Sequence, residues 1–155
     1  MSTNNAVPEN EVFLLREDIG SIATLTLNRP EKFNVLSTGL MDLMQGQFDQ
    51  LARDTSIRVV IIAANGRVFC AGHDLSEMEA ETSAAAIGAM FKQCSHLMMS
   101  LTRLPQPVIA KVHGVATAAG CQLVAQCDLA IAADDVRFAT SGINIGLFCG
   151  TPMVA

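Results

Sequence analysis

The sequence Asn65-Gly-Arg-Val-Phe-Cys-Ala-Gly-His-Asp-Leu-Ser-Glu-Met78 is the stretch on which the fold depends. It follows the run Val-Val-Ile-Ile-Ala-Ala at residues 59–64, which has strand character, and a helical pattern begins near Leu75. A strand therefore ends here, a glycine-containing turn follows, and a helix begins. Ligands in open α/β sheets usually bind at the carboxyl ends of the strands, so this turn is a candidate binding site.

A second turn of the same kind lies further along the chain. Residues 108–112 have strand character, residues 113–120 (His-Gly-Val-Ala-Thr-Ala-Ala-Gly) are mostly small, and an apolar stretch begins at Cys121. Two such turns, each after a strand and before a helix, can aim backbone N–H groups at one point. This arrangement suits an oxyanion that develops during a reaction.

The spacing of apolar residues predicts a repeated order of strand and helix, which indicates an α/β fold. The strand over residues 58–64 is apolar throughout, so we expect it to be covered on both faces. The other predicted elements are a β-hairpin over 12–16 and 22–28, a helix capped by Ser37 that ends by about Thr55, a helix over 87–101, a strand over 108–112, a short helix after the second turn, a strand over 128–133 that pairs near one over 136–139, and a loop over 142–150.

The composition narrows the class of protein. Half of the 155 residues are hydrophobic, 16% are charged, the net charge is −5 and there is no basic cluster, so we expect one domain and no nucleic-acid partner. No apolar run approaches the ~18 residues of a membrane span, so no membrane partner is expected. We expect a flexible segment over residues 1–11 and a core domain over residues 12–155. The first dozen residues lack the features of a signal or transit peptide, which predicts a cytoplasmic location.

The cysteines and histidines indicate neither a disulfide framework nor a metal site. The five cysteines form no Cys-x-x-Cys pair, and their odd number favours reduced, mostly buried thiols. The three histidines have no metal-site spacing with cysteine or with one another, so no metal is expected.

Several of these segments resemble the enoyl-CoA hydratase/isomerase (crotonase) family. Residues 67–78 and 107–122 are similar to its two signature segments, residues 28–30 (Asn-Arg-Pro) to its first turn, and residues 127–132 to the strand that follows. The similarity runs from about Val12 onward. It implies a spiral of repeated ββα units that is incomplete at the C-terminus, because members of the family continue well past the position of this chain's last residue.

The resemblance also implies a ligand, an assembly and a set of site residues. The ligand is an acyl-CoA thioester, with coenzyme A as part of the substrate and no other cofactor, and the assembly is a homotrimer or hexamer. The backbone N–H groups of His73 and Ala119 would form an oxyanion hole. Lys32 and Phe33 would lie near the coenzyme A part. The remaining substrate-binding candidates are Ala71, Gly72, Asp74 and Cys149.

The sequence departs from the hydratase pattern at both catalytic carboxylates. Hydratases of the family use two glutamates, and their positions here are Gln122 and Gly142. General acid–base catalysis contributes about 10²–10⁴-fold per positioned group, so we expect hydration to be very slow. Three alternatives stay open: decarboxylation of a malonyl-type thioester, thioester hydrolysis, and a non-catalytic or incomplete acyl-CoA-binding or interaction module. A decarboxylase relative carries the same Ala-Gly-His-Asp sequence as residues 71–74.

Ordinary structural roles compete with these assignments. We expect the backbone of His73 to matter more than its side chain. Asp74 precedes an apolar run and is predicted to cap the following helix. Cys149 is a candidate nucleophile, but a thiol in an apolar setting is usually inert.

Overall fold

The computed structural model describes residues 12–81 and 83–146. Residues 1–11, predicted to be flexible, and the candidate Cys149 lie outside the described residues. Among the described residues, no helix combines the length and hydrophobicity that a membrane crossing requires.

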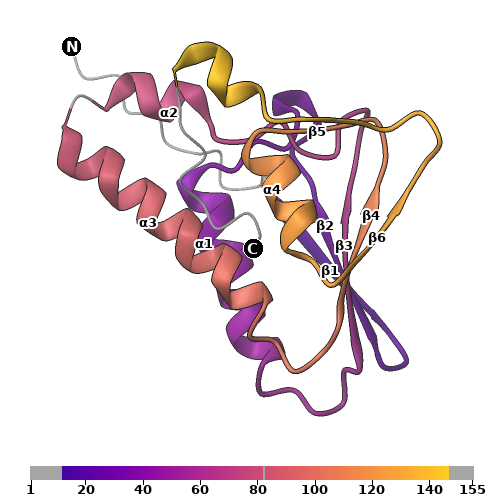
Figure 1. Ribbon diagram of the computed structural model, residues 1–155. Helices are drawn as coiled ribbons and strands as arrows, with labels where there is room; N and C mark the ends of the chain where they lie inside the picture. The colour runs from indigo at the N-terminus through magenta and orange to yellow at the C-terminus, as the bar shows by residue number, and fades with distance from the viewer. Residues whose placement is uncertain (1–11, 82, 147–155) are drawn as a thin grey trace.

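A five-stranded sheet forms one side of the molecule (Figure 1). Its order is β1-β2-β3-β4-β6, in which β1 is antiparallel to β2 and the remaining neighbours are parallel. The strands are β1 (Leu14–Ile19), β2 (Ile22–Leu27), β3 (Val59–Ala64), β4 (Val108–Val112) and β6 (Leu129–Ala132). The predicted hairpin is confirmed, and its tight turn contains Gly20 at φ +59°, a conformation that glycine adopts without steric cost.

Two long helices, α1 (Thr38–Leu51) and α3 (Ala84–Leu101), lie with α4 (Ala119–Gln126) on one side of this sheet (Figure 1). The predicted cap of α1 is confirmed, because the Leu40 N–H donates to Ser37 Oγ at 3.2 Å. One stripe of the helix is buried in the core, as its helical spacing predicts. Its buried members are Leu40, Met41, Met44, Phe48 and Leu51.

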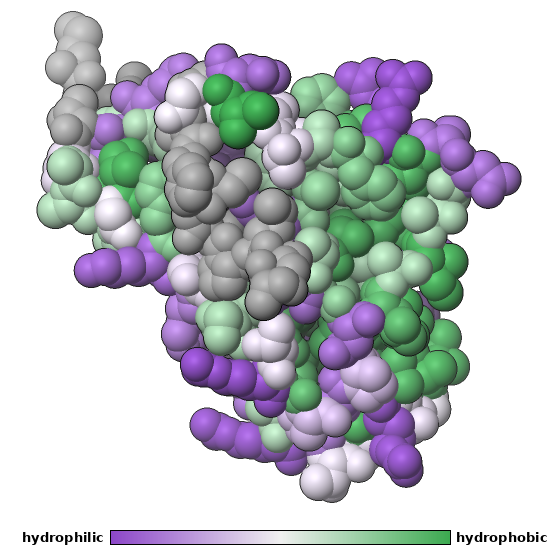
Figure 2. All heavy atoms as spheres, viewed as in Figure 1, coloured by the Kyte–Doolittle hydropathy of each residue, from purple (hydrophilic) through white to green (hydrophobic). Residues whose placement is uncertain are grey.

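The prediction that β3 is covered on both faces is wrong. Val60 and Ile62 face the core and are fully buried, whereas Val59 and Ile61, on the other face, are only half-buried. The helices therefore cover one face of this strand, and its opposite face carries apolar side chains without the same cover. The strand β6 has even less cover, because all of its residues are exposed. Figure 2 shows hydrophobic side chains on the surface in this region.

A second, smaller sheet joins β5 (Val115–Thr117) to β7 (Arg137–Ala139) in parallel. This corrects two predictions: residues 113–120 contain a strand, and the strand near residues 136–139 pairs with β5 and not with β6. Both strands have three residues, and their pairing depends on partners far apart in the sequence. Short elements complete the fold, namely the 3-10 helices η1 (Pro30–Lys32) and η2 (Ser141–Ile145) and the helix α2 (Leu75–Ala80).

Candidate functional site

The first turn is held in place by the side chain of Asn34, which is fully buried. Its Oδ1 accepts a hydrogen bond from the Arg29 N–H at 2.8 Å. Its Nδ2 donates to the carbonyls of Asn65 and Val68, both at 2.8 Å. One amide therefore ties the end of β2 to the turn after β3.

The next part of the turn is bound to the segment that precedes α1. Leu36 and His73 form a parallel bridge, in which the Leu36 N–H donates to the Gly72 carbonyl at 2.7 Å and the Asp74 N–H donates to the Leu36 carbonyl at 3.4 Å. In this bridge the Gly72 carbonyl and the Asp74 N–H, on either side of His73, face Leu36. The His73 N–H therefore points away from Leu36. No hydrogen bond joins it to another residue of ranges 12–81 and 83–146.

Asp74 caps α2, as predicted. Its Oδ1 accepts from the Ser76 N–H at 3.0 Å, and its side chain is nearly buried. Its other oxygen lies 3.6 Å from Arg29 Nη1, and the Arg29 guanidinium in turn lies over the Phe13 ring at 4.6 Å. Because these contacts occupy the carboxylate, Asp74 fits a structural role better than a catalytic one.

The second turn contains a backbone conformation that alanine rarely adopts. Ala118 has φ +50° and ψ −125°, and its N–H donates to the Ala139 carbonyl at 2.9 Å. Ala119 then begins α4 in helical geometry, so the strain lies one residue before the proposed donor. As the first residue of a helix, Ala119 has no intrahelical partner for its N–H. It also makes no such bond to any other residue that the structure describes.

The two turns are in direct contact. Cys70 and Ala116 form a parallel bridge, and the Thr117 N–H donates to the Cys70 carbonyl at 3.0 Å. Gly72 has φ +99°, and a Cβ on it would lie 2.8 Å from Ala118 Cβ and 3.2 Å from the Ala119 nitrogen. Gly72, which precedes the candidate donor His73, therefore packs against the other candidate donor, Ala119.

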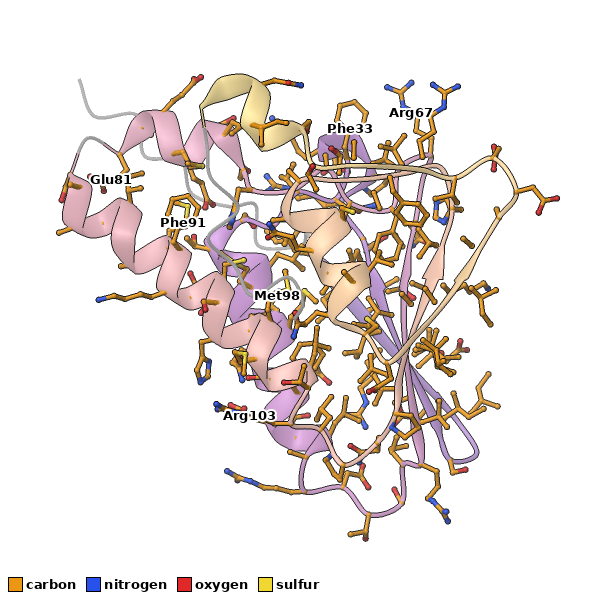
Figure 3. All side chains as sticks on the ribbon, viewed as in Figure 1. Phe33, Arg67, Glu81, Phe91, Met98 and Arg103 are labelled. Atoms are coloured by element: carbon orange, nitrogen blue, oxygen red, sulfur yellow. The ribbon has the colours of Figure 1, made fainter. Side chains whose placement is uncertain are left out.

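The His73 side chain is turned toward α3. Its ring meets Phe91 edge to face, with 5.3 Å between centroids and 79° between planes (Figure 3 labels Phe91). Burial lowers the pKa of the His73 imidazole, so the ring is neutral at pH 7. Its Nδ1 is buried and has no hydrogen-bond partner among the described residues.

No carboxylate occupies the two hydratase positions. Gln122 is buried in α4, with 3% of its surface exposed, and its side chain makes no hydrogen bond to a described residue. Gly142 lies in η2. Next to these positions, the hydroxyls of Thr117 and Ser141 lie 2.7 Å apart and join β5 to η2. Sequence reasoning missed this hydroxyl pair, because only the β5–β7 register could have revealed it.

The loop after η1 lies beside the first turn. The Ala71 N–H donates to the Phe33 carbonyl at 3.1 Å. Phe33 has φ +54° and is 39% exposed, and the Arg67 guanidinium lies 5.0 Å from its ring centroid (Figure 3). Lys32 is exposed at the adjacent position. The structure thus places the Arg67 guanidinium and the exposed Phe33 ring together beside the first turn, next in sequence to the exposed Lys32.

Three of the described thiols are not poised for nucleophilic attack. Burial raises the pKa of Cys70, Cys94 and Cys127 to about 12, so each stays protonated near neutral pH. Within residues 12–81 and 83–146, no group of three or more His, Cys, Asp or Glu side chains is placed to hold a metal ion.

Solved structures of known proteins share this architecture. An enoyl-CoA hydratase from Mycobacterium smegmatis is 55% identical, with a TM-score of 0.89 over 92% of this chain and 56% of that one. Human enoyl-CoA hydratase domain-containing protein 3 is 42% identical, with a TM-score of 0.86 over 91% of this chain and 56% of that one. The predicted crotonase-like α/β fold is confirmed.

Sequence comparison gives similar relatives. The enoyl-CoA hydratase domain-containing protein 3 of Danio rerio is 47% identical over 141 residues, which is 91% of this chain and 49% of the relative. The Xenopus laevis protein of the same name is 43% identical over 155 residues, which is 100% of this chain and 52% of the relative. The sequence of residues 140–151 also resembles this branch. The chain spans about half the length of the curated relatives it matches.

These relatives are mitochondrial proteins by name, so the prediction of a cytoplasmic location is wrong. That prediction depended on the polar composition of the first dozen residues, which does not determine a location.

The family model for enoyl-CoA hydratase/isomerase matches residues 17–155 and so includes both turns, the segment before α1 and the positions of the two missing carboxylates. This chain belongs to the enoyl-CoA hydratase/isomerase family.

Proposed function

We propose that this chain binds an acyl-CoA thioester and stabilises the enolate form of the thioester through the backbone N–H groups of His73 and Ala119. The observation that carries the proposal is the contact between the two turns. Gly72 packs against Ala118 and the Ala119 nitrogen, and neither donor N–H bonds to another described residue. Two such neighbouring donors suit one oxygen atom.

The chemistry of a thioester fits these donors. When the α-carbon loses a proton or a carboxyl group, negative charge moves onto the thioester oxygen. Fixed backbone donors stabilise that charge, and the loss of one donor costs about 3–4 kcal/mol of barrier. The small side chains of Ala118 and Ala119 and the absent one of Gly72 let a ligand come close to the backbone.

The side chains beside the first turn support coenzyme A as the carrier. Its nucleotide end offers phosphates and an adenine ring. Lys32 and Arg67 supply positive charge, and Phe33 exposes an aromatic face beside Ala71. Arginine and aromatic rings are both suited to stacking with a base, and lysine and arginine to phosphate. We assign Lys32 and Phe33 to the coenzyme A part and Ala71 and Gly72 to the thioester end.

Hydration at the rate of ordinary hydratases is not part of this proposal. Gln122 cannot take up a proton at neutral pH, and Gly142 has no side chain, so neither can replace a glutamate. The loss of one positioned acid–base group costs about 10²–10⁴-fold. A reaction that needs only the oxyanion hole is better supported.

Decarboxylation of a malonyl-type thioester is such a reaction. The electrons of the breaking C–C bond move into the enolate, carbon dioxide leaves, and water then protonates the carbon. The neutral side chain of the buried Gln122 favours this reaction over hydration, because decarboxylation requires no carboxylate base. For the assembly we propose a homotrimer or hexamer, which sedimentation analysis of the purified chain would test.

The decisive experiment is a titration of the purified chain with [1-13C]butyryl-CoA, followed by 13C NMR. We expect saturable binding and a downfield shift of the thioester carbonyl, because hydrogen bonds polarise it. Crotonyl-CoA hydration should be at least a hundredfold slower than for a hydratase with both glutamates, about the contribution of one acid–base group, and malonyl-CoA is the substrate to assay next. Binding without a carbonyl shift would indicate a non-catalytic module. Fast hydration would contradict our account of the site.

A further inference from the structure

Thr38, at the start of α1, makes hydrogen bonds to side chains of two other helices. The Thr38 N–H donates to Glu77 Oε2 of α2 at 2.9 Å. The Thr38 carbonyl accepts from Gln93 Nε2 of α3 at 3.0 Å, and the same nitrogen donates to Asp42 Oδ1 at 2.6 Å. We call the contacts of Thr38 with Glu77 and Gln93 the Thr38 clamp.

The clamp lies next to the bridge that orients the first candidate donor. Leu36, two residues before Thr38, bonds to Gly72 and Asp74 on either side of His73. Glu77 follows Asp74 within the first turn of α2. Residues 36–38 and 72–77 are therefore attached to each other at two points: the bridge at one end and the Glu77 carboxylate at the other.

Two attachment points fix an orientation that one point cannot. The bridge holds residues 72–74, and the Glu77 bond adds a second contact three residues further along the chain. Gln93 holds the same residue, Thr38, against α3. An active-site donor must be held to within about 0.5 Å and 10–20° to act on a reacting oxygen. The bond is also charge-assisted, because a carboxylate accepts from an N–H at a helix N-terminus.

We propose that Glu77 and Gln93 are positioning residues that fix the direction of the His73 N–H through the Thr38 clamp. This inference rests on the proposed function, because it concerns one of the two donors of the same oxyanion hole. Neither side chain needs to touch the substrate. Their effect should appear in the polarisation of the thioester carbonyl and much less in affinity.

The sharpest variant is Thr38→Pro. Thr38 is the first residue of α1, where proline is well tolerated because its fixed φ suits a helix start. The preceding Ser37 has φ −71° and ψ 160°, a conformation that also suits a residue before proline. The substitution therefore removes the N–H that donates to Glu77 and preserves the helix.

The chain offers a matched control. Ala84 is the first residue of α3, it also follows a serine cap in extended conformation, and its N–H donates to no described residue. Ala84→Pro should behave like the unmodified chain. Glu77→Ala removes the other half of the bond, and Glu79→Ala, an exposed glutamate on the same helix, is its control. Glu77→Gln keeps a hydrogen-bond acceptor without the charge, so it should keep part of the carbonyl shift that Glu77→Ala loses.

The test repeats the [1-13C]butyryl-CoA titration with each variant. We expect Thr38→Pro and Glu77→Ala to lose more than half of the carbonyl shift with little change in Kd, and the two controls to keep it. Amide hydrogen exchange of Leu36 and Asp74 should also become about tenfold faster in Thr38→Pro, because local opening becomes easier. If Glu77→Ala does not fold, Thr38→Pro and Glu77→Gln carry the test.

The outcomes separate the two proposals. If the unmodified chain shows the shift and folded Thr38→Pro shows the same one, the clamp does not position the donor and this inference fails alone. If the unmodified chain binds no acyl-CoA or shows no shift, the oxyanion-hole proposal fails and this inference fails with it.

Discussion

The two turns of the site reach the backbone conformations they need by different means. The first turn places a glycine, Gly72, at φ +99°, where a side chain would be strained. The second turn places an alanine, Ala118, at φ +50°, which costs on the order of 1–3 kcal/mol and persists only when the surrounding structure enforces it. Here the Ala139 carbonyl holds its N–H, and Gly120 packs against the carbonyl of Cys70. The comparison teaches that the positive φ of the second turn is enforced by the surrounding structure, whereas that of the first turn comes from the choice of glycine itself.

The largest effect should come from Gly120→Ala, which tests those surroundings. A Cβ at this position would lie 2.3 Å from the Cys70 oxygen and 2.7 Å from its carbonyl carbon, both backbone atoms that cannot move cheaply. We expect the free energy of unfolding in urea to fall by about 3 kcal/mol or more. A Cβ on Gly88 in α3 would meet nothing within 4 Å, so Gly88→Ala should raise the free energy of unfolding by up to about 1 kcal/mol. Equal effects of the two substitutions would contradict the close packing of the turns.

Gly72→Ala should have the next largest effect. The substitution combines a positive φ with a contact to Ala118 Cβ at 2.8 Å, so we expect a loss of about 2 kcal/mol in urea unfolding and of the carbonyl shift with bound butyryl-CoA. Gly20→Ala separates the two causes, because Gly20 also has a positive φ but meets nothing within 4 Å. A loss for Gly20→Ala as large as that for Gly72→Ala would mean that contact between the turns contributes nothing.

Ala118→Gly should change stability in the opposite direction. It relieves the strain of a positive φ and adds the entropy of a glycine in the unfolded chain, so we expect a net gain of about 1 kcal/mol in the same assay. Ala89→Gly, at an exposed position in α3, should instead cost about 1 kcal/mol. A loss for Ala118→Gly would show that its conformation carries no strain and that the two turns do not differ as described.

The smallest effect concerns pH and the first turn alone. Burial lowers the pKa of His73, so the unfolded chain, with a pKa of about 6.5, binds more protons than the folded chain below that pH. Stability should therefore fall as the pH falls from 7 through this window and stop falling below the folded-state pKa. His73→Asn should flatten this part of a profile of unfolding midpoint against pH. An unchanged slope would place the imidazole in solvent, away from Phe91.

The sequence predicted the parts of the site that depend on neighbouring residues. The caps at Ser37 and Asp74 and the first turn follow from local patterns, and the structure confirms them. The β5–β7 pairing was missed because strands of three residues carry little periodic signal and their partners lie far apart. The strain at Ala118 was missed because an alanine gives no sign of a positive φ. The Thr38 clamp joins three helices and could be found only in three dimensions.

Asn34 has a consequence for the order of events in folding. Its one side chain needs acceptors at Asn65 and Val68, on the far side of a helix and a strand. The loop that presents Phe33 cannot be finished until that whole unit has closed, so it should be among the late-forming parts of the molecule. If coenzyme A binds at that loop, as we propose, its binding would report the last stage of refolding and leave the earlier collapse undetected.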